Sequence, residues 1–82
     1  MSEESFAALQ RAMRLLSEAV DDLPDECRAV AGNALLNVAA EAVAHDVGRR
    51  QAGMIFARLG DLLSRGLQPS ADRAVPLTAF DA

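Results

Sequence analysis

Hydrophobic residues recur every three or four positions along most of the chain, separated by polar residues. Near the N-terminus this spacing places one apolar stripe opposite a polar face. The stripe consists of Phe6, Leu9, Met13, Leu16, Val20 and Leu23. Ser2 suits an N-cap, and Glu3 and Glu4 follow it at the positive end of the helix dipole. The pattern predicts an amphipathic helix from about Glu3 to Asp22.

The next segment, from about Pro24 to Asp46, is hydrophobic on nearly every side. Pro24 ends the first helix and is tolerated in the first turn of a second one. Two apolar stripes lie on almost opposite faces of this second helix. One consists of Cys27, Ala31, Ala34, Leu35, Val38, Ala42 and His45, and the other of Ala29, Gly32, Leu36, Ala40, Val43 and Val47. A helix that is apolar all round belongs in an interior.

The second of these stripes is the candidate self-association surface. The chain's own helices are expected to cover the stripe through Leu35 and Val38, but an 82-residue chain has little else to cover the other one. Small residues on that side let a second backbone approach closely. We therefore expect a homodimer paired through Gly32, Leu36, Ala40, Val43 and Val47.

A third helix is predicted to begin near Gly48 to Arg50 and to end at Gly66, a suitable C′ residue. Its apolar arc consists of Ala52, Ile55, Phe56, Leu59, Leu62 and Leu63. Gly48 and Gly53 weaken a continuous helix without forbidding one. The pattern therefore leaves open whether residues 24–66 form two helices or one long bent helix.

The helical pattern gives the expected fold class, and the chain length and cysteine count indicate that the fold needs association. The pattern predicts an all-α protein: a three-helix bundle over residues 1–66 and an extended or disordered tail over residues 67–82, where Pro69 and Pro76 break helices. A chain this short buries only about 60% of its unfolded surface. Its single cysteine, Cys27, excludes an internal disulfide. Dimerisation is the expected means of completing the core.

Charge is unevenly distributed along the chain. The net charge is −4, which argues against nonspecific binding of nucleic acids or anionic membranes over the whole surface. Residues 1–48 carry nine acidic and three basic side chains, whereas residues 49–66 carry four arginines and one aspartate. The candidate basic contact face consists of Arg49, Arg50, Arg58 and Arg65. One alternative function is therefore a small acidic DNA-binding regulator that uses its arginine-bearing third helix.

His45 suggests a further alternative function, which is metal binding or phosphotransfer. It lies one helical turn after Glu41, a spacing at which two side chains can hold one metal ion. The segment from Ala44 to Arg49 also resembles the phosphorylated-histidine segment of histidine phosphotransfer domains, although Gly48 and Arg49 stand in the reverse order. The resemblance covers about six residues. It implies that His45 accepts a phosphoryl group and that Arg49 stabilises it.

No motif points to an enzyme or a cofactor: the sequence has no phosphate loop, serine triad or paired-carboxylate site. The acidic N-terminus does not resemble a secretory signal, and the apolar stretch from Ala34 to Ala44 is too short to span a bilayer. With no cysteine framework, a cytoplasmic location is expected. The leading hypothesis is a helical interaction module that binds itself and an unidentified protein, as a regulator or adaptor.

Overall fold

The computed structural model describes residues 2–80 and shows an all-α protein. The helices are α1 (Glu3–Asp21), α2 (Asp25–Arg28), α3 (Ala31–Val47) and α4 (Arg49–Ser64), followed by a 3-10 turn, η1 (Leu77–Phe80). No strand occurs in this part of the chain, and one isolated β-bridge joins Ser70 to Arg73. Three of the α-helices are long, as predicted. The separate α2 was not predicted, so a count of three is not confirmed.

The ends of α1 follow from local sequence, as predicted. The Oγ of Ser2 accepts a hydrogen bond from the backbone N–H of Ser5 at 3.1 Å, which caps the helix. Glu3 and Glu4 occupy the first turn. At the other end the chain leaves the helix after Asp21, shortly before Pro24.

The prediction of one helix from Pro24 to Asp46 is wrong in its first part. α2 ends at Arg28, and the backbone of Val30 leaves the helical region at φ −117° and ψ 17°. The chain therefore turns before α3 begins at Ala31. Neither glycine nor proline marks this break, which explains why the apolar periodicity alone extended the helix across it.

Gly48 separates α3 from α4, so residues 24–66 are not one bent helix. Its φ of 86° and ψ of 157° lie in a region that is essentially restricted to glycine. The far end of α4 has the predicted glycine C′ residue: Gly66 has a φ of 104° and its N–H donates to the carbonyl oxygen of Leu63. The N–H of Leu67 donates to the carbonyl oxygen of Leu62, which completes a Schellman motif.

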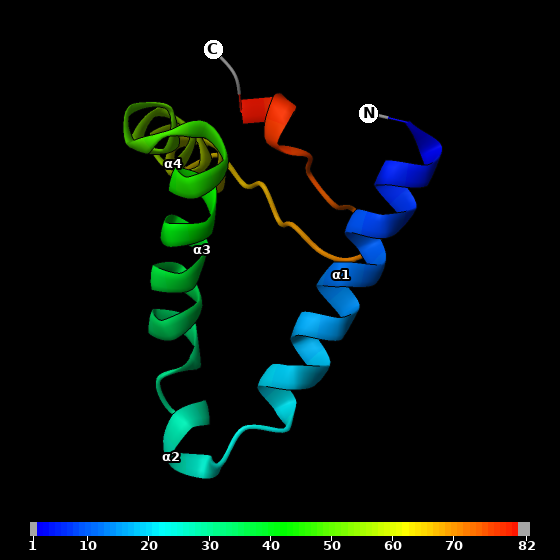
Figure 1. Cartoon of the computed structure of the whole chain (residues 1–82), viewed down its shortest axis with the longest axis vertical. Helices are drawn as coiled ribbons and strands as arrows, with labels where there is room; N and C mark the ends of the chain where they lie inside the picture. The colour runs from blue at the N-terminus through cyan, green and yellow to red at the C-terminus, as the bar shows by residue number, and fades with distance from the viewer. Residues whose placement is uncertain (1, 81–82) are drawn as a thin grey trace.

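The helices form an open V rather than a closed bundle (Figure 1). α1 and α3 are its two arms and converge near α2, while α4 crosses the far end of α3. α3 packs against α4, and α4 packs against η1. Residues 65–76 cross from α4 to α1 and then return toward η1 (Figure 1); where they reach α1, Arg14 and Asp72 form an ion pair at 3.2 Å.

Residues 67–76 contain no helix and include a turn at residues 71–72 between the bridged Ser70 and Arg73, and the last described residues form η1. Ala74 and Phe80 are among the buried residues, so this segment contributes to the core. The division of the chain into a domain of residues 1–66 and a tail of residues 67–82 stays a prediction. Residues 1, 81 and 82 lie outside the described part.

The buried core is small. Within residues 2–80 the buried hydrophobic residues are Ala31, Ala52, Ile55, Ala74 and Phe80, and three of these are alanines. The accessible surface of the chain is 6385 Å², whereas a compact monomer of this mass exposes about 4,700 Å². The radius of gyration is 13.5 Å, against about 12 Å expected for a compact domain of this length. The protomer is therefore open and leaves much apolar surface uncovered.

Candidate association surface

The five residues predicted to mediate self-association lie on one side of α3. Successive residues of an α-helix are separated by about 100°, so these positions fall within an arc of roughly 80°. We call this set the α3 stripe: Gly32, Leu36, Ala40, Val43 and Val47. Its side chains are exposed except for Val43, which is half-buried.

The middle of the α3 stripe is the most accessible part. Leu36 is 60% exposed, and Gly32 and Ala40 lie one turn to either side of it and are exposed too. A Cβ atom added at Gly32 would meet nothing within 4 Å. A large apolar side chain between two small residues lets another helix approach closely and surround it.

The expectation that the chain's own helices cover the other stripe is wrong for every member except Ala31, which is buried. Leu35 is 44% exposed and Val38 is 64% exposed. The physical reason is that α1 diverges from α3 and does not run along this side of it (Figure 1). Both sides of α3 are therefore accessible in the protomer.

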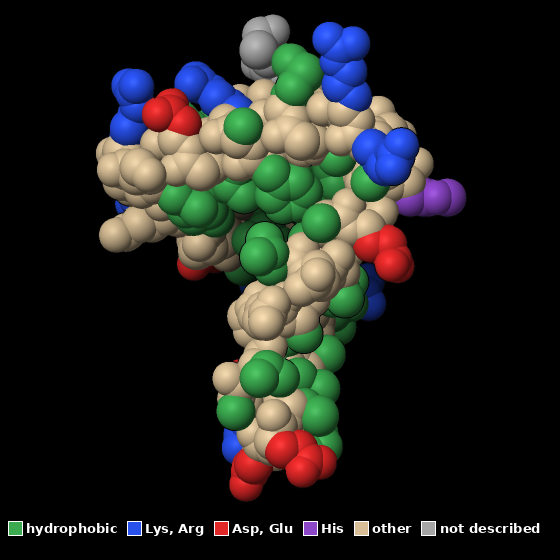
Figure 2. Space-filling view, turned by 90° about the vertical axis from the view of Figure 1, so that its left-hand side faces the viewer, with side chains coloured by type: hydrophobic (Ala, Val, Ile, Leu, Met, Phe, Trp, Pro, Cys, Tyr) green, Lys and Arg blue, Asp and Glu red, His purple; other side chains and the backbone are tan. Residues whose placement is uncertain are grey.

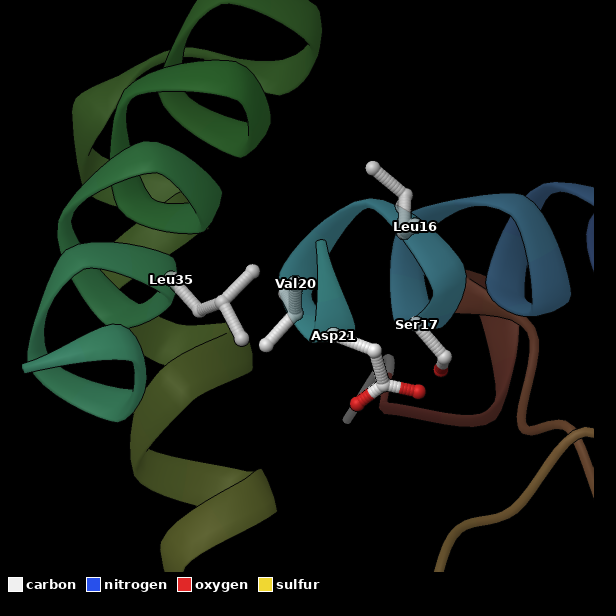
Figure 3. Close-up of a pocket in the computed structure, with 5 residues that line it drawn as sticks. All are labelled: Leu16, Ser17, Val20, Asp21 and Leu35. Carbon is white, nitrogen blue, oxygen red and sulfur yellow. The ribbon is translucent and has the colours of Figure 1, made fainter. Parts of the chain in front are cut away.

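A pocket of about 250 Å³ lies where the two arms approach each other (Figure 3). Its lining residues are Leu16, Ser17, Val20 and Asp21 of α1 and Leu35 of α3. Val20 and Leu35 point toward one another across it. Leu16 and Val20 belong to the apolar stripe of the first helix, but periodicity could not show that they face an opening instead of a packed neighbour.

Hydrophobic side chains continue beyond these residues. On the side of the molecule turned away from α1 they extend along α3 and into the angle below α4 (Figure 2). Other large hydrophobic residues that are exposed include Leu15, Val30, Met54 and Leu63. Exposed apolar surface on this scale is typical of proteins that associate.

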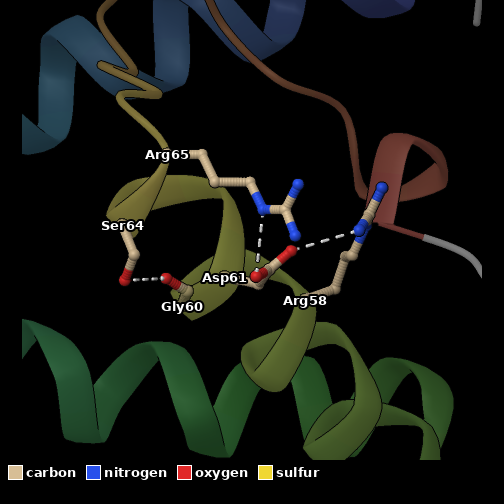
Figure 4. Close-up of polar contacts among 5 residues, drawn as sticks. All are labelled: Arg58, Gly60, Asp61, Ser64 and Arg65. Carbon is tan, nitrogen blue, oxygen red and sulfur yellow. Dashed lines mark hydrogen bonds and ion pairs between the residues drawn. The ribbon is translucent and has the colours of Figure 1, made fainter.

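The four arginines of the candidate basic face do not act as one group. Asp61 accepts from Arg58 at 3.4 Å and from Arg65 at 3.2 Å, so two of the four guanidinium groups share one carboxylate (Figure 4). Arg49 and Arg50 begin α4 at the opposite end of that helix and are exposed, with no ion pair among the described residues. The arrangement leaves a smaller basic patch than the sequence indicated.

His45 lies in the last turn of α3 and is exposed. Between residues 2 and 80 no group of three or more histidine, cysteine, aspartate or glutamate side chains is placed to hold a metal ion. Glu41 is exposed on the same helix, one turn earlier. The structure adds no further ligand to this pair.

None of the helices within residues 2–80 is both long and apolar enough to cross a membrane. Comparison of the chain with protein-family models, with curated proteins and with solved structures gave no match.

Proposed function

We propose that this chain is a non-enzymatic helical interaction module that forms a homodimer through the α3 stripe and acts as a regulator or adaptor of another macromolecule. The observation that supports it best is the excess surface of the protomer. The 6385 Å² of accessible surface exceeds that of a compact monomer by roughly 1,700 Å². The single cysteine allows no internal disulfide that would stabilise so open a protomer.

The size of this excess agrees with association. A standard protein–protein interface buries about 800 Å² on each partner. The protomer's excess is roughly twice that area, so one interface of standard size would account for about half of it. The remainder, which includes the apolar surface between α1 and α3, supports the adaptor role in the proposal.

The weak internal core supports the same proposal. Ile55 and Phe80 are the large side chains in the buried set of residues 2–80, and each retains a few per cent of its exposure. Small domains with so little internal burial are commonly stabilised by disulfides, metals or oligomerisation. With one cysteine in the chain, self-association is the means for which the structure offers a surface.

The two alternative functions have less support. For DNA binding, the pairing of Arg58 and Arg65 with Asp61 reduces the available positive charge, in a chain whose net charge is −4. For metal binding, no group of three or more potential ligands occurs within residues 2–80, and for phosphotransfer the support is the short resemblance of residues 44–49. The α3 stripe, in contrast, has both exposure and suitable residue types.

Analytical ultracentrifugation tests the self-association directly. We expect the wild type to sediment as a dimer at about 10 µM and Leu36→Asp to sediment as a helical monomer. Placing an unpaired carboxylate in a buried interface should weaken dimerisation by about 100-fold or more, which corresponds to about 3 kcal/mol.

Leu15→Asp is the matched control, because Leu15 is similarly exposed but lies on α1. It should leave the dimer intact. A well-folded wild-type monomer at micromolar concentration would contradict the proposal, as would equal effects of both substitutions.

The adaptor role is tested by affinity purification from the native cell with wild-type and Leu36→Asp chains as parallel baits. We expect a macromolecule that is retained by the wild type and lost with the monomeric variant, and that binds the wild type again when both are purified. Recovery of the wild-type chain alone, under conditions in which it is dimeric, would contradict the adaptor role and leave the dimer unaffected.

A further inference from the structure

We infer that the two copies of α3 pair antiparallel, across a twofold axis beside Leu36. This inference rests on the proposed self-association and specifies its geometry. It is supported by two independent observations: which part of the α3 stripe is accessible, and how charge is distributed at the two ends of the helix. The partner that covers the α3 stripe is a second copy of this chain.

The accessible part of the stripe is centred on Leu36. α4 crosses the C-terminal end of α3 (Figure 1), and there Val43 is half-buried and Val47, at 37%, is less exposed than Leu36 at 60%. The free length therefore runs from Gly32 to Ala40, with Leu36 midway between them. An interface between identical subunits related by a twofold axis has to be self-complementary.

Antiparallel pairing at this register satisfies that requirement. It places Gly32 of each copy opposite the partner's Ala40, and the two Leu36 side chains meet beside the axis. Small residues then face small residues at both flanks, so the backbones approach closely and the leucines fill the centre. Neither Gly32 nor Ala40 has a side chain that would hold the helices apart, and the space around Gly32 is open.

Charge favours the antiparallel over the parallel orientation. The α2 end of α3 is acidic, with Asp22 and Glu26 exposed and unpaired among the described residues. The α4 end carries the exposed Arg49 and Arg50 next to the exposed Asp46, so the two arginines outnumber the one carboxylate there. Antiparallel helices bring the acidic end of each copy beside the basic end of the other, twice by symmetry. Parallel helices would bring like charges together at both ends.

Disulfide cross-linking tests the orientation in a Cys27→Ser background. Disulfides need Cα atoms within about 7 Å, so they report which residues face each other. We expect a mixture of Gly32→Cys and Ala40→Cys chains to give a cross-linked heterodimer, while neither variant cross-links with itself. Leu36→Cys should cross-link with itself.

The other outcomes overturn the inference in distinguishable ways. Self-cross-linking of Gly32→Cys and of Ala40→Cys, without the mixed product, would indicate parallel helices. Absence of every cross-link in a chain that sediments as a dimer would place the interface elsewhere and leave the proposed dimer standing. If the wild type sediments as a monomer, both the proposed dimer and the antiparallel arrangement are wrong.

Charge reversal provides a second test. Arg49→Glu combined with Arg50→Glu should weaken dimerisation at least tenfold at low ionic strength, and the effect should shrink as salt is added. Adding Asp22→Arg and Glu26→Arg to the same chain restores opposite charges at both ends of the antiparallel dimer. We expect this fourfold variant to recover most of the wild-type affinity.

The control for net charge is Arg58→Glu combined with Arg65→Glu, which makes the same change of charge on α4 away from these contacts. It should weaken the dimer much less. Equal weakening by the control, or no recovery in the fourfold variant, would show that the ends of α3 do not meet and would overturn the antiparallel assignment.

Discussion

Gly48 determines where α3 ends and α4 begins. Its backbone angles are strained for any L-residue with a side chain, although a Cβ atom there would meet nothing within 4 Å. Any cost of a side chain at Gly48 therefore comes from the backbone conformation and not from a clash with other residues. Because Gly48 joins the two helices, its backbone angles contribute, together with the packing of α3 against α4, to the angle between them.

Gly48→Ala should lower the free energy of unfolding by about 1–3 kcal/mol, because alanine makes the native backbone conformation unfavourable. Urea denaturation followed by circular dichroism, at one fixed protein concentration, measures the change. Gly53→Ala is the control: Gly53 lies within α4 with open space at its Cβ, so alanine should stabilise the helix by up to about 1 kcal/mol. Similar effects of the two substitutions would contradict the role of backbone strain.

Among the three long helices, α1 is the least firmly held. α3 packs against α4 and α4 against η1, whereas α1 diverges from α3 and contributes no buried residue. Its ion pair between Arg14 and Asp72 is exposed, and such pairs contribute about 0–1 kcal/mol. α1 should therefore open more readily than the rest of the molecule.

Hydrogen–deuterium exchange tests this difference between elements. Under dimer-dissociating conditions, such as in Leu36→Asp, amides in the middle of α1 should exchange at least about tenfold faster than those in the middle of α4. The comparison uses helices of similar length, so fraying at the ends affects both alike. Equal protection of α1 and α4 would show that α1 is part of the same cooperative unit.

The sequence predicted the ends of helices correctly where local signals mark them. Ser2, Pro24 and Gly66 mark helix ends through capping or backbone restriction, and α1 and the end of α4 were predicted within two residues. The turn at Val30 has no such signal and was missed. Periodicity placed the α3 stripe on one face, but the exposure of Leu35 depends on the angle between α1 and α3, which distant residues determine.

At the scale of the whole molecule, stability and association should be inseparable. A protomer with few buried residues and roughly 1,700 Å² of excess surface gains much of its stabilisation only when a second copy covers the α3 stripe. If unfolding and dissociation occur together, each tenfold rise in protein concentration favours the folded dimer by about 1.4 kcal/mol. The melting temperature then depends on concentration.

Differential scanning calorimetry of the wild type should accordingly show Tm rising by about 3–6 °C for each tenfold increase between 1 and 100 µM, since about 1 kcal/mol shifts Tm by 2–4 °C in an assembly of this size. Leu36→Asp should melt at a lower temperature that does not change with concentration, because its monomer has no partner to lose. Leu15→Asp should keep the wild-type dependence. A wild-type Tm that is constant over this range would mean that the open protomer is stable alone, and that the exposed face of α3 contributes nothing to folding.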